Sequence, residues 1–194
     1  MEFYPREKPL PVKLKTALLQ LRPLRSTDNA LDYEAVMASR EFLRIGTGGL
    51  WPADGFTPEE NYQDLQRHEQ DHEARLSFTF TILNPEGTEC LGCLYVNSLD
   101  QLLEKYPAIS TLEQSFPAGG ATAVFWMRPE SQAEGLDNHL LNQLMEWFAK
   151  EWAFPIVVYL ANQLEIHYQR VYEQAGLKPL MTLGSPHRLT LFGR

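Results

Sequence analysis

The sequence predicts a single α/β domain in which helices cover both faces of a mixed β-sheet. At 194 residues, of which 44% are apolar, the chain is long enough for one domain with a sizeable core. Short runs rich in β-branched and aromatic residues alternate with stretches of helical periodicity, in the order β-α-α-β-β and then β-α-β-α-β-β. Residues 1–17 contain three prolines and are expected to form an amino-terminal arm, and residues 18–194 are expected to form the domain.

The first part of the domain is expected to supply one strand and two helices. A strand is predicted over 18–24, and Ser26-Thr-Asp28 then offers helix-cap chemistry. Thr57-Pro-Glu-Glu60 has the form of a second helix start, with proline at the first helical position, for a polar helix that ends near residue 75. Between these helices, residues 40–58 are rich in glycine, proline and aromatic residues. We predict a long loop there, a kind of segment that is often functional.

The rest of the domain is expected to alternate strands and helices. In order, the predicted elements are strands over 76–83 and 89–96 joined by an Asn84-Pro-Glu-Gly87 turn, an irregular insertion at 98–120 with a short helix near 99–106, a strand over 122–127, a helix over 136–152, a strand over 155–160, a helix over 165–175 that ends at Gly176, and a last strand over 187–192.

The charge balance restricts the class of partner. The formal net charge of -8 argues against nonspecific binding to nucleic acid or anionic membranes and favours cationic partners. No apolar run approaches the roughly 20 residues that a membrane helix needs, and no export signal is visible. We therefore expect a cytoplasmic protein, with neither nucleic acid nor membrane among its partners. The sequence leaves open whether it is a monomer or a homodimer.

His68-Glu-Gln-Asp-His72 fits the His-Glu-x-x-His pattern of zinc proteases, with Glu69 as the candidate base. Helices that carry such sites are normally buried, whereas nearly all side chains around this motif are polar or charged. A solvated helix explains the segment better, and we reject the protease interpretation.

Cys90-Leu-Gly-Cys93 contains both cysteines of the chain. With the two histidines they could form a structural zinc site. However, side chains three residues apart in a strand point to opposite faces, unless a bulge at Gly92 realigns them. A thioredoxin-like role lacks the helix that should follow the pair. Two buried thiols in a sheet are the favoured interpretation, and no metal is expected.

One segment carries most of the functional information. A strand that ends at Met127 runs into Pro129, then into Gln132-Ala-Glu-Gly135-Leu-Asp137 and an amphipathic helix. This order places a loop of backbone N–H groups at a helix N-terminus, where an anion such as a pyrophosphate can bind.

This segment resembles the Gln/Arg-x-x-Gly-x-Gly/Ala turn with which the GNAT family of N-acetyltransferases holds the pyrophosphate of acetyl-CoA. Leu19-Gln-Leu-Arg-Pro-Leu-Arg-Ser-Thr-Asp28 is similar to the first strand and helix entry of that family. Tyr172-Glu-Gln-Ala-Gly-Leu177 is similar to its Tyr-Glu-Lys-x-Gly-Phe ending. The resemblance spans roughly residues 18–192 and is closest to the branch that acetylates protein amino termini and small amines. It implies the acyl-CoA N-acyltransferase fold, with a mostly antiparallel sheet.

The resemblance also implies a site for acetyl-CoA as cosubstrate. Phe125 and Met127 would bind the pantetheine amides through their backbone, and an N–H near Met127 would polarise the thioester carbonyl. Tyr172 would be the general acid that protonates the departing thiolate. The backbone amides expected to hold the pyrophosphate are those of Gln132, Ala133, Glu134, Gly135, Leu136 and Asp137.

The sequence departs from the family pattern in the cofactor site. Asp137 stands where the family has a small residue, and Glu134 adds a second carboxylate beside the expected pyrophosphate. Like charge disfavours binding unless both side chains point to solvent. The asparagine that the family often has seven residues before its tyrosine is replaced by Glu165. Asn162, three residues earlier, could serve through an altered turn.

A general base is also missing from the pattern. The strand over 121–127 contains no carboxylate, so a water relay or a residue of the 40–57 loop would have to deprotonate the amine. In that loop, Trp51 and Phe56 are candidates for lining an acceptor pocket. Trp126, Trp147 and Trp152 are expected to be packing residues.

We therefore expect an enzyme that transfers acetyl from acetyl-CoA to a primary amine of a small molecule or peptide. The amine would attack directly in a ternary complex, without a cysteine intermediate. The acidic charge balance suits a cationic acceptor. The alternative is a catalytically degenerate GNAT-fold binding or regulatory module, which Glu134, Asp137 and the missing base favour.

Overall fold

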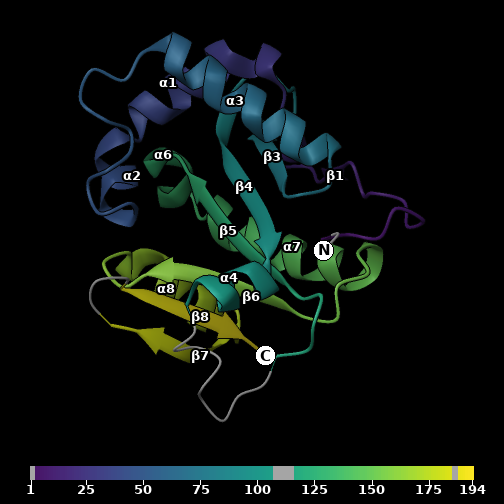
Figure 1. Ribbon diagram of the computed structural model, residues 1–194. Coiled ribbons are helices and arrows are strands. Elements are labelled where there is room, and N and C mark those ends of the chain that lie inside the picture. Colours follow the sequence, from purple (N-terminus) through teal and green to yellow (C-terminus); the bar gives the residue numbers. More distant parts are fainter. Residues whose placement is uncertain (1–2, 107–115, 185–187) are drawn as a thin grey trace.

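A computed structural model describes residues 3–106, 116–184 and 188–194. Within these residues the chain forms one eight-stranded sheet with the strand order β1-β2-β3-β4-β5-β6-β8-β7 (Figure 1). Neighbouring strands are antiparallel except β5 and β6, which are parallel. This confirms the predicted mixed, mostly antiparallel sheet. The strands are β1 (Leu14–Lys15), β2 (Gln20–Pro23), β3 (Phe78–Leu83), β4 (Cys90–Ser98), β5 (Ala121–Met127), β6 (Val157–Asn162), β7 (Lys178–Leu183) and β8 (Leu189–Gly193).

Helices cover both faces of this sheet. They are the 3-10 turn η1 (Ser26–Asp28) and the α-helices α1 (Asn29–Ala38), α2 (Arg40–Gly46), α3 (Pro58–Glu73), α4 (Leu99–Lys105), α6 (Pro129–Ala133), α7 (Leu136–Glu151) and α8 (Ile166–Gln174). Phe125 and Trp126 are neighbours in β5, so their side chains point to opposite faces. Phe125 belongs to the core that α7 and α8 share, whereas Trp126 belongs to a second core beneath α1, α2 and α3. In Figure 1 these last three helices lie together in the upper part of the molecule.

The two central parallel strands separate after a short contact. β5 and β6 pair only from Ala121 with Val157 to Ala123 with Tyr159, although both strands continue beyond this point. The N–H of Ala121 donates to the carbonyl of Ile156, on the β6 side. Backbone groups of alternate strand residues point to the same side, so those of Phe125 point to the gap between β5 and β6.

The start of α3 confirms the predicted helix signal. The Thr57 hydroxyl accepts a hydrogen bond from the N–H of Glu60 at 3.2 Å. The Glu60 carboxylate in turn accepts from the N–H of Thr57 at 2.8 Å. This reciprocal pair, together with Pro58 at the first position, satisfies N–H groups that have no partner within the helix.

Two segments differ from the sequence prediction. Residues 40–46, predicted to be part of a loop, form α2, because Leu43 is buried against the sheet and Arg40 and Arg44 both pair with Asp54 in the following loop. The amino-terminal arm supplies β1, and its Phe3 packs in the core against Phe78 at a ring-centroid distance of 5.5 Å.

The predicted insertion at 98–120 is described only in part. Its short helix is α4, with Ser98 accepting the N–H of Gln101 as the N-cap. Residues 107–115 of this insertion lie outside the described residues, as does His187 at the start of the predicted last strand.

Candidate active site

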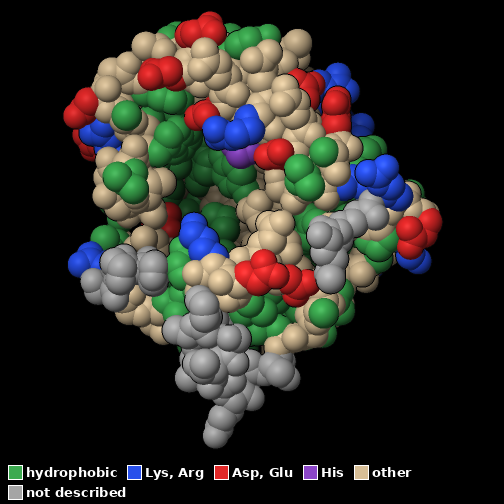
Figure 2. Space-filling view, in the orientation of Figure 1, with side chains coloured by type: hydrophobic (Ala, Val, Ile, Leu, Met, Phe, Trp, Pro, Cys, Tyr) green, Lys and Arg blue, Asp and Glu red, His purple; other side chains and the backbone are tan. Residues whose placement is uncertain are grey.

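A cavity of about 480 Å³ lies on the face of the sheet covered by α1, α2 and α3. It is lined by side chains of these helices and of β3 and β4, and it reaches the separating ends of β5 and β6 at Phe125 and Asn162. Figure 2 shows it as a hollow with hydrophobic walls, with charged side chains and a histidine at its edge. Trp51 and Trp126 both line it. Phe56 is buried behind Trp51, at a ring-centroid distance of 5.9 Å, so only one of the two loop aromatics predicted for an acceptor pocket lines this cavity.

Glu165 places a carboxylate in this cavity, directly before α8. Its Oε2 accepts a hydrogen bond from the backbone N–H of Asn162 at 2.8 Å. Burial raises the pKa of Glu165 above its ordinary value, and the hydrogen bond from Asn162 opposes the shift. When ionised, a half-buried carboxylate of raised pKa is a stronger base than an exposed one. In the sequence, Glu165 is recognisable only as a departure from the family pattern, at the position of an asparagine.

Asn162 lies at the end of β6 and also lines the cavity. Its amide Nδ2 donates to the carbonyl of Gly46 at 3.1 Å, and its Oδ1 accepts from the N–H of Leu164 at 2.9 Å. The side chain therefore joins α2 to the turn before α8. This arrangement fixes the position of Glu165, which shares the same turn.

Tyr172 is completely buried on the face of α8 that packs against the sheet. Its hydroxyl donates to the carbonyl of Leu160 at 3.3 Å. Leu160 is the first residue of β6 beyond the ladder with β5, so the phenol lies at the β6 side of the gap. Burial raises the pKa of Tyr172 well above its ordinary value, and the phenol keeps its proton.

Tyr168 lies one helical turn before Tyr172, and the two rings stack at a centroid distance of 6.2 Å. The N–H of Met127 donates to the Tyr168 hydroxyl at 2.9 Å. Met127 also uses its carbonyl, which accepts from Gln132 Nε2 at 2.7 Å. Both backbone groups of Met127 are therefore engaged within the protein, whereas Phe125 lies beyond the three-residue ladder of β5 and β6. Tyr168 lies four residues before Tyr172, and this helical spacing is the sequence signal that could have identified it.

The segment from Gln132 to Asp137 forms the predicted junction between strand and helix, with one additional element. Residues 129–133 form the short helix α6, and Gly135 then adopts a left-handed conformation, with φ of 75°, as the N-cap of α7. Ala133 and Glu134 are exposed, and Leu136 is half-buried. Gln132 contacts the carbonyl of Met127, so α6 lies beside the end of β5.

Asp137 is completely buried, and its carboxylate pairs with His167 of α8. The same carboxylate accepts a hydrogen bond from the N–H of Asn138 at 2.8 Å. The side chain therefore points into the protein, toward a partner on another helix. Glu134 is exposed, so the condition that both carboxylates point to solvent is met for Glu134 but not for Asp137, whose carboxylate stays at the N-terminus of α7.

The histidines of the rejected zinc protease motif lie on one face of α3, as their spacing predicted. His72 Nδ1 lies 3.2 Å from the carbonyl oxygen of Thr79, and His68 Nδ1 lies 3.2 Å from the hydroxyl of the same residue. This face is buried against β3, and burial lowers the pKa of both imidazoles. The prediction of a solvated helix was therefore wrong for this face, because the histidines are part of the packing.

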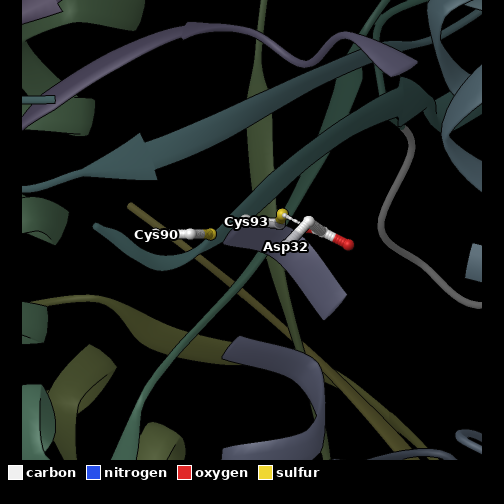
Figure 3. A group of neighbouring side chains, drawn as sticks. All are labelled: Asp32, Cys90 and Cys93. Carbon is white, nitrogen blue, oxygen red and sulfur yellow. Dashed lines mark hydrogen bonds between the residues drawn. The ribbon is translucent and has the colours of Figure 1, made fainter. Parts of the chain in front are cut away.

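The two cysteines are free, buried thiols, as favoured from the sequence. They nevertheless lie on one face, because the register between β3 and β4 shifts at Leu83 and leaves Leu91 as an extra residue. Gly92 permits this bulge, since a Cβ there would overlap the carbonyl oxygen of Trp126. The cysteines converge on Asp32 of α1 (Figure 3), and no histidine among the described residues joins this group.

Within the described part of the chain, no helix combines the length and the apolar character needed to cross a membrane.

The sequence profile of the GNAT acetyltransferase domain matches residues 19–178. No protein of curated function matches the chain in sequence. Among solved structures, the ribosomal-protein-S5-alanine acetyltransferase from Vibrio fischeri is similar, with a TM-score of 0.68, 16% identity and coverage of 95% of this chain and 96% of that one. RimL, a ribosomal α-N-protein acetyltransferase in complex with coenzyme A, gives a TM-score of 0.72 at 15% identity, with coverage of 92% and 94%. The microcin C7 self-immunity acetyltransferase MccE, in complex with acetyl-CoA and AMP, gives 0.70 at 10% identity, with coverage of 92% and 93%. These similarities show a shared fold.

Proposed function

Because the chain belongs to the GNAT acetyltransferase family, we propose that it transfers acetyl from acetyl-CoA to a primary amine, by direct attack in a ternary complex. One observation carries this proposal. The cavity beneath α1, α2 and α3 reaches the gap where β5 and β6 separate, so a molecule in the cavity has access to the backbone of Phe125. The solved structures of RimL with coenzyme A and of MccE with acetyl-CoA support the choice of cosubstrate.

The residues on the other side of the gap fit acetyl-CoA. Phe125 offers its backbone carbonyl, which lies outside the ladder, to an N–H of the pantetheine amides. The N-terminus of α7, at Gly135, offers N–H groups and the positive end of the helix dipole to the pyrophosphate. In this proposal the cofactor-binding residues are Phe125 and those of the turn from Gln132 to Asp137. Met127, predicted to bind through its backbone, instead bonds to Tyr168 and Gln132 and fixes the end of β5. Asn162 contributes by holding the end of β6.

Acetyl-CoA supplies an activated acetyl group, and the chain supplies proton transfers and charge stabilisation. Glu165 accepts a proton from the attacking amine as the new C–N bond forms. The N–H of Phe125 donates to the thioester oxygen, where negative charge develops. Tyr172 gives its proton to the sulfur as the C–S bond breaks. The products are an N-acetylated amine and a free thiol, and proton exchange with solvent restores Glu165 and Tyr172.

The choice between peptide and small-molecule acceptors follows from the neighbours only by analogy. RimL and the Vibrio enzyme are named for ribosomal-protein substrates. We propose an acceptor that carries an amine, and the acidic charge balance favours a cationic one. We also propose that the protein is cytoplasmic and that neither nucleic acid nor membrane is among its partners.

Two measurements on the same preparation test the proposal. Calorimetric titration with acetyl-CoA should show saturable binding, and release of free thiol should depend on an added amine from a panel of diamines, aminoglycosides and peptides. Saturable binding with no turnover against any amine would instead identify a binding or regulatory module. A folded protein that does not bind acetyl-CoA would refute both.

A further inference from the structure

Asp32 is a buried carboxylate on the wall of the cavity, with only 4% of its surface exposed. It accepts a hydrogen bond from Asn61 Nδ2 at 2.9 Å and one from the Cys93 thiol at 3.4 Å. Neither donor carries a charge. Because a buried carboxylate without a cationic partner is costly, a cation in the cavity would stabilise it.

The described residues do not supply that cation. None of their ion pairs includes Asp32. Asp28 and Asp64, the charged groups that act on Asp32, are acidic and add to the effect of burial in raising its pKa. His68 lines the same cavity, but burial lowers its pKa and favours the neutral imidazole. Arg67 is paired with Asp64 at 2.9 Å, and 63% of its side chain is exposed.

The walls around Asp32 add a second feature that suits an organic cation. Trp51, Tyr95 and Trp126 line the same cavity, and aromatic faces attract ammonium and guanidinium groups. A carboxylate combined with aromatic walls favours an alkylammonium or guanidinium over a neutral ligand.

The position of Asp32 separates it from the reaction centre. Its partner Cys93 lies in β4, directly opposite Trp126 of β5, and the gap that exposes Phe125 lies on the far side of β5. Asp32 therefore lies beside β4, with β5 between its partner Cys93 and the gap. An amine paired with a carboxylate also has a raised pKa and stays protonated, which makes it a poor nucleophile.

We propose that Asp32 binds a second cationic group of the acceptor, while the amine to be acetylated lies beside Glu165. The acceptor is then a molecule with two basic nitrogens separated by at least about the 4.8 Å spacing of neighbouring strands, such as an α,ω-diamine. This inference rests on the proposed function for the position of the reacting amine, whereas binding of a dication at Asp32 is measurable without any turnover.

A metal ion is the competing occupant. Ligand atoms of Asp32, Cys90 and Cys93 lie within 4.8 Å of one another, as Figure 3 shows for their side chains. Thiolates and a carboxylate are suitable ligands for Zn²⁺. Among the described residues, however, no fourth histidine, cysteine or acidic side chain completes the group. Burial and the nearby Cys90 and Asp32 also raise the pKa of Cys93, which opposes thiolate formation.

The test compares matched ligands and matched variants by calorimetry in the absence of acetyl-CoA. The ligands are α,ω-diamines of three to six carbons, the monoamines of equal length, and Zn²⁺. The variants are Asp32→Asn and Glu41→Gln, which removes an exposed charge from α2, away from the cavity. We expect at least one diamine to bind the wild type at least tenfold more tightly than its monoamine. Asp32→Asn should abolish this difference and Glu41→Gln should preserve it.

Three results would overturn the proposal. The first is equal diamine affinity in the wild type and Asp32→Asn, and the second is a folded wild type that binds none of the diamines. The third is stoichiometric Zn²⁺ binding that Cys93→Ser abolishes, which would make the group a metal centre. Diamine binding that depends on Asp32 but is followed by no acetyl transfer would uphold the cation site and refute the proposed function.

Discussion

The carboxylate of Glu165 occupies the space that a side chain at Gly46 would need. A Cβ built at Gly46 overlaps Oε1 of Glu165, and the Gly46 backbone needs no left-handed conformation. An alanine at this point of α2 would therefore push the Glu165 carboxylate away from its present position. The residue directly before α8 and the last residue of α2, more than 100 positions earlier in the chain, are thus in direct spatial contact.

Gly46→Ala should lower kcat at least about tenfold, because it displaces the Glu165 carboxylate without changing its charge, and a positioned base contributes about 10²–10⁴-fold. The KM for acetyl-CoA should stay unchanged. Steady-state kinetics measure both. Gly184→Ala is the matched control, since a Cβ there has open space. Full activity in Gly46→Ala would mean that the carboxylate at this position does not act as the base.

The raised pKa of Glu165 predicts a pH dependence with a definite sign. Glu165 accepts a proton only when ionised, so kcat/KM should rise with pH through a pKa above the ordinary value of about 4.3. The folded protein also holds this proton more tightly than the unfolded chain does. The contribution of Glu165 to the free energy of unfolding therefore falls as the pH rises through the same range. Glu165→Gln should remove this limb of the rate profile and this dependence of stability. An unchanged rate profile would assign the limb to another group.

Tyr172→Phe should lower kcat about 10- to 100-fold and leave the affinity for acetyl-CoA nearly unchanged. The variant loses the proton donor at the β6 side of the gap and keeps the ring that packs against Phe125. Stopped assays of thiol release and calorimetry separate the two effects. Tyr159→Phe serves as the control, because Tyr159 is a buried neighbour whose ring contacts that of Tyr172. Equal rates for Tyr172→Phe and wild type would remove Tyr172 from the mechanism.

Gly135→Val should weaken acetyl-CoA binding at least tenfold. A Cβ at Gly135 meets no atom of the protein, but φ of 75° is a conformation that a β-branched residue adopts at a cost of about 1–2 kcal/mol. The N-terminus of α7 must then move, and its N–H groups lose their alignment. Gly135→Asn tolerates the left-handed conformation better and should bind with intermediate affinity. Equal affinities in all three proteins would place the pyrophosphate elsewhere.

The strands and helices were largely predictable because their signals are local. The start of α3 illustrates this, since Thr57, Pro58 and Glu60 carry the capping chemistry in four consecutive residues. The helix α2 was missed because its stabilising contacts are tertiary. Leu43 is buried against the sheet and Arg44 pairs with Asp54 beyond the helix, in a segment whose glycines and prolines favour a loop.

The candidate site was predictable only where a motif is contiguous. The turn from Gln132 to Asp137 was located from its sequence, but the partner that turns Asp137 inward, His167, is 30 residues away. Glu165 was read as a substitution for asparagine, because its proximity to Gly46 arises from folding. A bulge at Gly92 was one possibility in the sequence. The register between β3 and β4 shows that the bulge is present and that it brings the two cysteines to one face.

The separation of β5 and β6 after three paired residues has a consequence for the order in which the two substrates bind. It leaves the backbone of Phe125 without a strand partner on the β6 side, at the edge of the cavity beneath α1, α2 and α3. In the proposed reaction the amine binds in the cavity, acetyl-CoA binds on the other side of the gap, and the two react at the gap. Both substrates can therefore be bound at the same time. The size of the acceptor is limited by the cavity beneath α1, α2 and α3.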